Sequence, residues 1–262
     1  MGIRDKVTGL GSAVGQRAGN AVAAGMVAVG NARERAVERE WARRALDNLP
    51  EPQAPTPEVW EHSLGSLIKA GFENTPKPVG KVLDGLISLG GIRFGPETVG
   101  FDGQDIPWEK VVEIRCHNAF LKMTTSSLEQ EVDKIRDLLP PVPGRKWALT
   151  KIGEGLSTVL LASMEQADPA TMVATEIVYT GMLGRTKTLD AGMYATSILA
   201  QKPAVQHSLI ATAQALGVTV VTVDPGPQAQ RIQARVRALR DRAAAVTARL
   251  EIVEAEPEHP VG

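Results

Sequence analysis

The hydrophobic pattern of the chain changes its period at Gly90-Gly91. Before this pair, apolar residues recur every three or four positions, which is the spacing of one face of a helix. After it, apolar and polar residues alternate over 92–117, as they do in strands with one buried face. The dipeptide Asp102-Gly103 favours a tight hairpin turn between two of these strands. A chain that contains both periods packs helices against a sheet, so we expect an α+β fold.

The alternating region predicts an antiparallel meander followed by a helix. We expect its strands at 92–94, 98–101, 106–117 and 119–124. The helix over 127–139 begins at a serine pair with capping-box spacing and ends at a proline pair.

Residues 91–115 read GIRFGPETVGFDGQDIPWEKVVEIR and resemble bacterial PH-like domains, in which a glycine-containing hairpin precedes an I-P-W-x-x-V/I step. The resemblance covers 91–139 and implies a PH-like barrel of seven strands with a helix that plugs one end. Strands around 147–149 and 156–164 would have to complete that barrel. The cluster of basic residues with which some members bind phosphoinositides is absent from the first hairpin, so headgroup recognition is not carried over.

The rest of the body, which spans 58–226, adds helices and a further α/β portion. Helical spacing predicts helices over 58–72 and 79–89. Beyond the PH-like element we expect a strand over 172–180, helices over 190–201 and 203–216, and a strand over 218–223. This last segment is a continuous apolar run, which indicates burial on both faces, and a turn at 224–226 ends it.

Long helices are expected at both ends of the chain. The first, over 1–49, is weakly amphipathic and ends at the proline-rich linker 50–57. Its best apolar window, 18–32, is shorter than the roughly 20 residues that a membrane span needs. The second, over 227–253, has the heptad spacing of a coiled coil, so another copy could pair with it over 232–253. An acidic tail, 254–262, follows.

The net charge of −1 conceals a separation of charges along the chain. Basic residues are concentrated in the two terminal helices and suit an anionic membrane surface or a protein partner. The contact residues that we predict are Arg4, Lys6, Arg17, Arg231, Arg235 and Arg242. Only 4% of the residues are aromatic, which leaves few side chains for base stacking, so we expect no nucleic-acid partner.

Catalytic and metal-binding residue patterns are missing from the sequence. The single cysteine cannot form an intrachain disulfide, and no spacing suits zinc, so we expect no metal, no cofactor and a cytoplasmic location. Cys116 and His117 are adjacent in a predicted strand and should point to opposite faces, the cysteine buried and the histidine exposed. His207 is expected to be a capping or surface residue. We therefore predict no catalytic residue.

One loop, 180–188, carries a candidate ligand site. It offers two glycines and the polar side chains of Arg185, Thr186, Lys187 and Thr188, which together could bind an anion at the start of the following helix. A plain connection or a β-hairpin with polar residues is the alternative, because the P-loop spacing is absent.

Two functions are consistent with these patterns. The favoured one is a non-catalytic adaptor or scaffold that associates with a membrane surface or a protein partner through its terminal helices, peripherally at the inner face of the membrane. The alternative is an enzyme, or a nucleotide- or anion-binding protein, that uses the 180–188 loop.

Overall fold

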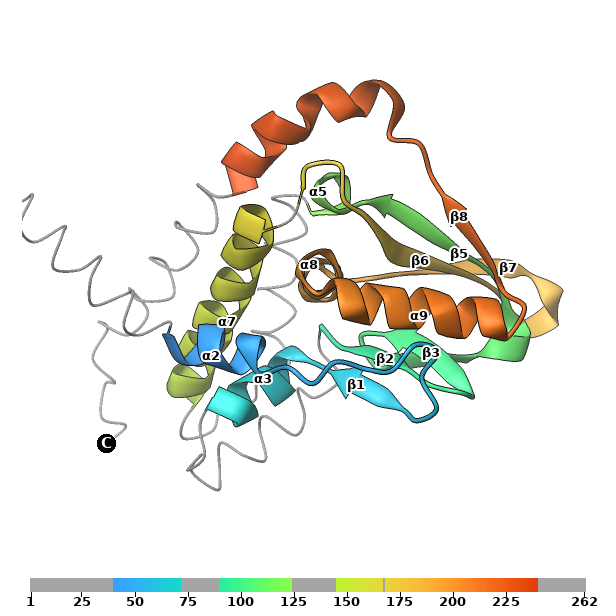
Figure 1. The fold of residues 1–262 in the computed structure, drawn as a ribbon, viewed down its shortest axis with the longest axis horizontal. Helices are drawn as coiled ribbons and strands as arrows, with labels where there is room; N and C mark the ends of the chain where they lie inside the picture. The colour runs from blue at the N-terminus through green and yellow to red at the C-terminus, as the bar shows by residue number, and fades with distance from the viewer. Residues whose placement is uncertain (1–39, 72–89, 124–144, 167, 240–262) are drawn as a thin grey trace, which may run out of the picture. The chain divides into compact units, whose positions relative to one another are not determined.

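The computed structural model describes residues 40–71, 90–123, 145–166 and 168–239 (Figure 1). The chain divides into two compact units, 1–40 and 41–262, and every described residue except Glu40 belongs to the second. The helices predicted over 79–89 and 127–139, the acidic tail and most of the first terminal helix lie outside the described residues. Of that terminal helix, α2 (Glu40–Asp47) is described and is helical.

The first sheet is an antiparallel meander of four strands. These are β1 (Trp60–His62), β2 (Ile92–Phe94), β3 (Thr98–Phe101) and β4 (Gln104–Pro107), paired in that order. Asp102 and Gly103 have φ values of 52° and 76°, the left-handed conformation that a tight hairpin turn requires, so the predicted turn is confirmed. Alternate side chains of β2 and β3 are buried in the core, as the period of two predicts.

The second sheet also has four strands, and it follows a 3-10 turn, η1 (Trp108–Lys110). Its strands are β5 (Val111–Asn118), β6 (Met172–Thr180), β7 (Thr186–Asp190) and β8 (Thr219–Thr222), in the order β7-β6-β5-β8. β5, β6 and β7 are antiparallel to their neighbours, whereas β8 runs parallel to β5. The predicted strand over 172–180 is therefore confirmed.

Helices complete the core. They are α3 (Leu64–Gly71), α5 (Ala119–Lys122), α7 (Arg145–Gln166), α8 (Met193–Gln201) and α9 (Pro203–Ala215). All nine residues of α8 are buried, and the helix contacts α5, α7, α9 and β6. Tyr194 at the start of α8 is among the largest fully buried side chains, together with Phe94, Phe101 and Phe120. The molecule is thus a mixed α+β protein, as predicted.

The predicted helix over 58–72 is wrong in its first part. Trp60 and His62 face the core and the residue between them is exposed, because this segment is strand β1. The helix begins only after Ser63, whose Oγ accepts a hydrogen bond from the Ser66 amide at 3.1 Å, while the Ser63 amide donates to Ser66 Oγ at 2.7 Å. This reciprocal pairing satisfies two backbone donors at the start of the helix, as a capping box does.

Two further strand predictions are wrong because short apolar runs suit helices as well as strands. The strands expected around 147–149 and 156–164 are parts of the single helix α7. The strand expected at 119–124 is replaced by α5, which Asn118 caps: its Oδ1 accepts from the amides of Phe120 and Leu121 at 3.1 and 3.2 Å.

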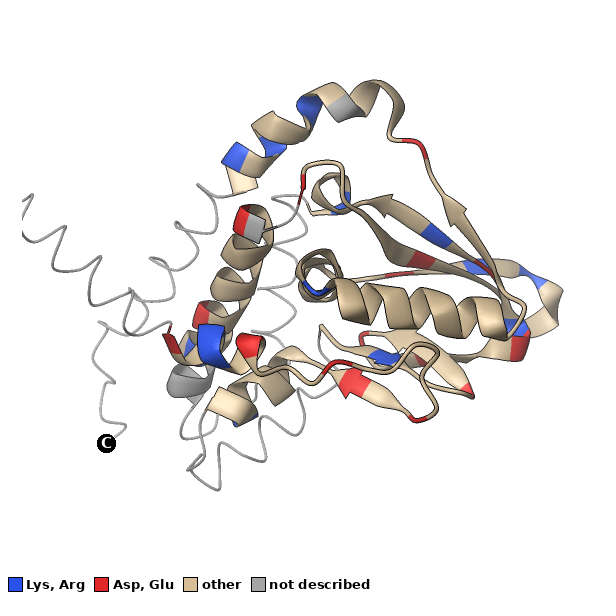
Figure 2. Ribbon diagram, viewed as in Figure 1, with Lys and Arg blue, Asp and Glu red and all other residues tan. Residues whose placement is uncertain are grey.

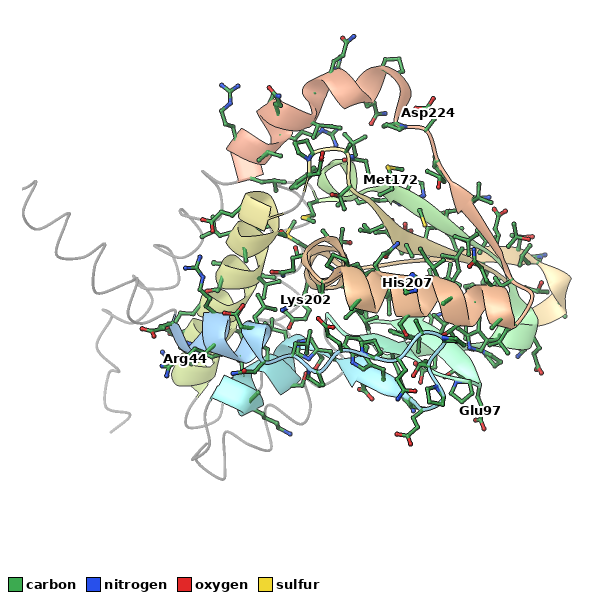
Figure 3. The ribbon with its side chains drawn as sticks, in the orientation of Figure 1. Arg44, Glu97, Met172, Lys202, His207 and Asp224 are labelled. Atoms are coloured by element: carbon green, nitrogen blue, oxygen red, sulfur yellow. The ribbon has the colours of Figure 1, made fainter. Side chains whose placement is uncertain are left out.

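β8 is an edge strand, and this position corrects the prediction that it is buried on both faces. Thr219, Val221 and Thr222 are exposed, and only one side of the strand is paired, with β5. The predicted turn after it forms, and the Asp224 side chain accepts from the Gly226 amide at 2.9 Å (Figure 3). On β5, Val112 is exposed rather than buried, because the pairing with β6 shifts between Val111 and Glu113.

The C-terminal segment begins with a 3-10 turn, η3 (Gly226–Arg231), and becomes helical over 232–239. Ile232 and Leu239 are buried in the core of the chain, and Val236 packs against it partly buried. These are the first seam positions of the predicted heptad helix, so this part of the seam is covered by the chain itself. No helix in the described part of the chain has both the length and the apolar composition to cross a membrane.

Candidate functional site

The segment 181–188 connects β6 to β7 as a β-hairpin. The last strand pair is Thr180 with Thr186, and beyond it the Gly181 amide donates to the Arg185 carbonyl at 2.7 Å. The turn itself is η2 (Met182–Gly184), in which Leu183 has φ 63° and ψ 23° and Gly184 has φ 70°. This loop is therefore a β-hairpin, which is one of the forms that the sequence analysis left open. The helix that follows, α8, begins only at Met193, so no helix N-terminus lies at this loop.

Two apolar side chains stand at the tip of this hairpin in solvent. Met182 is 86% exposed and Leu183 is 91% exposed. Among the described large apolar residues, the next most exposed is Val59, at 52%. Isolated exposed apolar residues are ordinary on protein surfaces, whereas two adjacent and almost fully exposed ones at a turn are less common and make this turn a candidate for contact with another surface.

The hairpin is cationic. Arg185 and Lys187 are exposed, and among the described residues no carboxylate lies within ion-pair distance of either. Figure 2 shows basic positions on the ribbon of β7 and its turn. The sequence contains no acidic residue between Glu176 and Asp190. The Lys187 stem packs over Gly181, where an added Cβ would lie 2.9 Å from Lys187 Cδ.

The four predicted ligand residues lie together on this hairpin. Thr186, Lys187 and Thr188 are successive residues of β7, so Lys187 points to the face opposite the two threonines. Arg185 precedes them at the end of the turn. All four side chains are exposed, and they do not enclose a binding cavity of the kind that holds a small ligand.

The basic side chains around the middle of β6 are paired with acids. Glu176 on β6 accepts from Arg115 at 2.9 Å, from His117 at 3.0 Å and from Lys122 at 3.4 Å, and Lys122 also contacts Asp190 at 2.7 Å. Burial would raise the pKa of Glu176, but Lys122 and Arg115 outweigh it and lower the pKa below its usual value.

Cys116 and His117 point to opposite faces of β5. Cys116 is buried, as predicted, and burial raises the pKa of its thiol. His117 is half-buried rather than exposed, because it packs beside Glu176, and burial followed by the charge of Lys122 lowers its pKa. The two residues therefore do not form a nucleophile and base pair. His207 on α9 is an exposed surface residue, as predicted (Figure 3).

A buried polar network that the sequence analysis did not find joins β1 to α8. His62 Nε2 lies 2.8 Å from the Tyr194 hydroxyl, and His62 Nδ1 lies 3.1 Å from Ser66 Oγ. Burial, with a smaller effect of Lys202, lowers the pKa of His62 to about 4, so the ring is neutral at pH 7. Burial also raises the pKa of Tyr194 well above its usual value.

The distances in this network assign its protons. Ser66 Oγ lies 2.7 Å from the Ser63 carbonyl, which can only accept, so Ser66 donates there. Ser66 Oγ then accepts from the His62 Nδ1 proton, and His62 Nε2 accepts from Tyr194. With its Nδ1 protonated, His62 donates to Ser66 and does not accept its proton. A cavity of about 830 Å³ adjoins these residues, between α2, β1 and α3.

The predicted contact residues near the C-terminus divide between two roles. Arg231 is exposed. Arg235 donates to the Leu121 carbonyl at 3.0 Å, so it fastens the helical stretch 232–239 to α5. The other four, Arg4, Lys6, Arg17 and Arg242, lie outside the described residues.

In the described part of the chain, no group of three His, Cys, Asp or Glu residues is arranged to hold a metal ion. No protein-family model, curated protein or solved structure matches the chain.

Proposed function

We propose that this protein is a non-catalytic adaptor that associates with an anionic membrane surface, at the inner face of the membrane, through its terminal helices and the β6–β7 hairpin. The observation that carries the proposal is the contrast between cations. Beside the middle of β6, Arg115 and Lys122 each contact a carboxylate, whereas at the end of the same strand Arg185 and Lys187 stand exposed, two residues apart, with no carboxylate near them in the described residues. Exposed cations grouped on one protruding element favour an anionic surface.

A PH-like body is part of this proposal. β1 to β4 and β5 to β7 are two consecutive antiparallel meanders, and in this proposal they would supply the seven strands of a PH-like barrel. The strands after the first meander come from β6 and β7, not from the segment around 147–164. This chain departs from the pattern in having α5 and α7 between β5 and β6, and in adding β8 at one edge.

The buried network supports the non-catalytic part. His62 and Ser66 are within hydrogen-bond distance, but the Ser66 hydroxyl donates its proton to the Ser63 carbonyl. The His62 ring is therefore not placed to activate Ser66 as a nucleophile. The network joins strand and helix, which is a structural role.

Co-sedimentation of the full chain with vesicles tests the proposal. We expect binding to vesicles that contain phosphatidylglycerol, little binding to pure phosphatidylcholine vesicles, and weaker binding as salt rises. The double variant Arg185→Ala, Lys187→Ala should bind roughly 10- to 30-fold more weakly, since each basic residue near an anionic surface contributes about 1 kcal/mol.

The matched control is Lys69→Ala, Lys202→Ala, which removes the same charge from α3 and from the junction of α8 and α9, outside the proposed contact elements, and should bind like the parent. Absence of binding to anionic vesicles at low salt, or an equal loss in both double variants, contradicts the proposal. In the same assay, removal of the basic residues Arg4, Lys6 and Arg17 tests the contribution of the first terminal helix.

A further inference from the structure

We infer that the tip of the β6–β7 hairpin inserts Met182 and Leu183 into the interfacial layer of an anionic phospholipid membrane. The inference rests on the proposed function and adds to it the element that enters the membrane and the residues that make contact. It starts from the two most exposed large apolar side chains among the described residues, which are adjacent at one turn.

The backbone of Leu183 has a conformation that disfavours a residue with a side chain. With φ 63°, Leu183 is in the left-handed region, which is unfavourable for a residue with a Cβ and which glycine or asparagine occupies more easily. The Leu183 side chain gains no stabilising burial within the chain in return, because it is 91% exposed. An apolar side chain at a strained and exposed position is explained when it contacts something outside the chain.

The neighbouring charges identify that contact as an anionic membrane rather than an apolar pocket on a protein. Arg185 follows Leu183 by two residues and Lys187 by four, and no acid occurs between Glu176 and Asp190. A strand rises about 3.3 Å per residue, and interfacial elements bury their apolar side chains about 5–10 Å deep. Insertion of the tip would therefore bring the two cations to the level of the lipid phosphates.

The hairpin is preorganised for this contact by interactions within the chain. Five residue pairs join β6 to β7, from Glu176 with Asp190 to Thr180 with Thr186. The Tyr179 hydroxyl accepts from Gln104 Nε2 at 2.9 Å, which ties the hairpin to the first sheet. A fixed turn loses little conformational entropy when it binds.

A fluorescent probe at the tip tests the insertion in the full chain. We would attach an environment-sensitive fluorophore to Met182→Cys and, as the control, to Val59→Cys on another exposed position. The native thiol, Cys116, is buried, so labelling goes to the introduced cysteine. On phosphatidylglycerol vesicles we expect the emission of the Met182→Cys probe to shift to the blue and that of the Val59→Cys probe to stay unchanged.

Polar substitution at the tip provides the second readout. The variant Met182→Gln, Leu183→Asn keeps every charge, and asparagine tolerates the left-handed conformation, so it should fold. We expect it to bind anionic vesicles at least about tenfold more weakly than the parent, whereas Val59→Asn should bind as the parent does.

The outcomes separate the two proposals. A chain that sediments with vesicles while the tip probe keeps its spectrum, or while the polar tip variant binds like the parent, contradicts insertion and leaves the adaptor proposal standing. A parent chain that does not sediment with anionic vesicles contradicts the adaptor proposal itself.

Discussion

The middle and the end of strand β6 differ in whether their side chains find partners within the chain. In the middle, Glu176 gathers Arg115, His117 and Lys122 within 3.4 Å, so the charges of this region satisfy one another. At the end, the hairpin leaves two cations without a carboxylate and two apolar side chains in solvent. Groups that the chain satisfies internally serve the fold, whereas groups that it leaves open at a steric cost are available to an outside surface.

The largest effect on the free energy of unfolding is expected at the buried residue His62. Because burial lowers its pKa in the folded state from 6.5 to about 4, the folded protein binds fewer protons than the unfolded chain between these values. The stabilisation is fully present above pH 6.5 and should fall by about 3 kcal/mol as pH drops to 4. Urea unfolding of the parent and of His62→Gln at pH 7, 5 and 4 measures this, and equal losses in both proteins would show that His62 is not responsible.

The next effect is expected at Glu176. Glu176→Ala removes the acceptor that Arg115, His117 and Lys122 share. Arg115 keeps Glu113 and Lys122 keeps Asp190, but His117 loses its carboxylate partner, so we expect the free energy of unfolding to fall by about 1 kcal/mol. Vesicle binding should not change, because this cluster is internal. Asp190→Ala is the control, since Asp190 is much more exposed and should contribute less than about 0.5 kcal/mol. A loss of vesicle affinity in Glu176→Ala without a loss of stability would break the comparison between the two parts of β6.

The smallest effect, and the one with the opposite sign, is expected at Leu183. Leu183→Asn should raise the free energy of unfolding by up to about 1 kcal/mol, because asparagine relieves the left-handed strain and no packing is lost. Thermal unfolding of this variant and of Met182→Gln, which relieves no strain, measures the difference. A lower stability in Leu183→Asn would mean that the side chain does serve the fold.

The sequence predicted the parts of the fold that local patterns determine. Alternation from residue 92 onward and the Asp102-Gly103 turn located most of the first sheet, and β6, α8 and α9 lie close to their predicted ranges. The single strand predicted over 106–117 is wrong, because η1 divides it into β4 and β5, which belong to different sheets. The sequence analysis failed where pairing with distant strands determines the structure of a segment. The exposure of β8 depends on its place at the edge of the sheet, and Trp60 is in a strand because it pairs with Phe94.

The proposed contact hairpin overlaps the loop that the sequence analysis selected. Arg185 and Lys187 were chosen from the sequence, but the chemistry of their loop was expected from a helix N-terminus that lies elsewhere. The apolar tip was missed, although Met182 and Leu183 between two glycines in an acid-free stretch were a readable signal. The His62–Tyr194 contact was not readable, because 132 residues separate the two side chains along the chain.

Amide hydrogen exchange of the full chain, with and without phosphatidylglycerol vesicles, tests most directly whether the hairpin faces a membrane. Our account predicts slower exchange for the amides of 181–185 when vesicles are present, and unchanged exchange for the β5 amides beside Glu176. Bound protein whose hairpin amides exchange at the same rate with and without vesicles would contradict it.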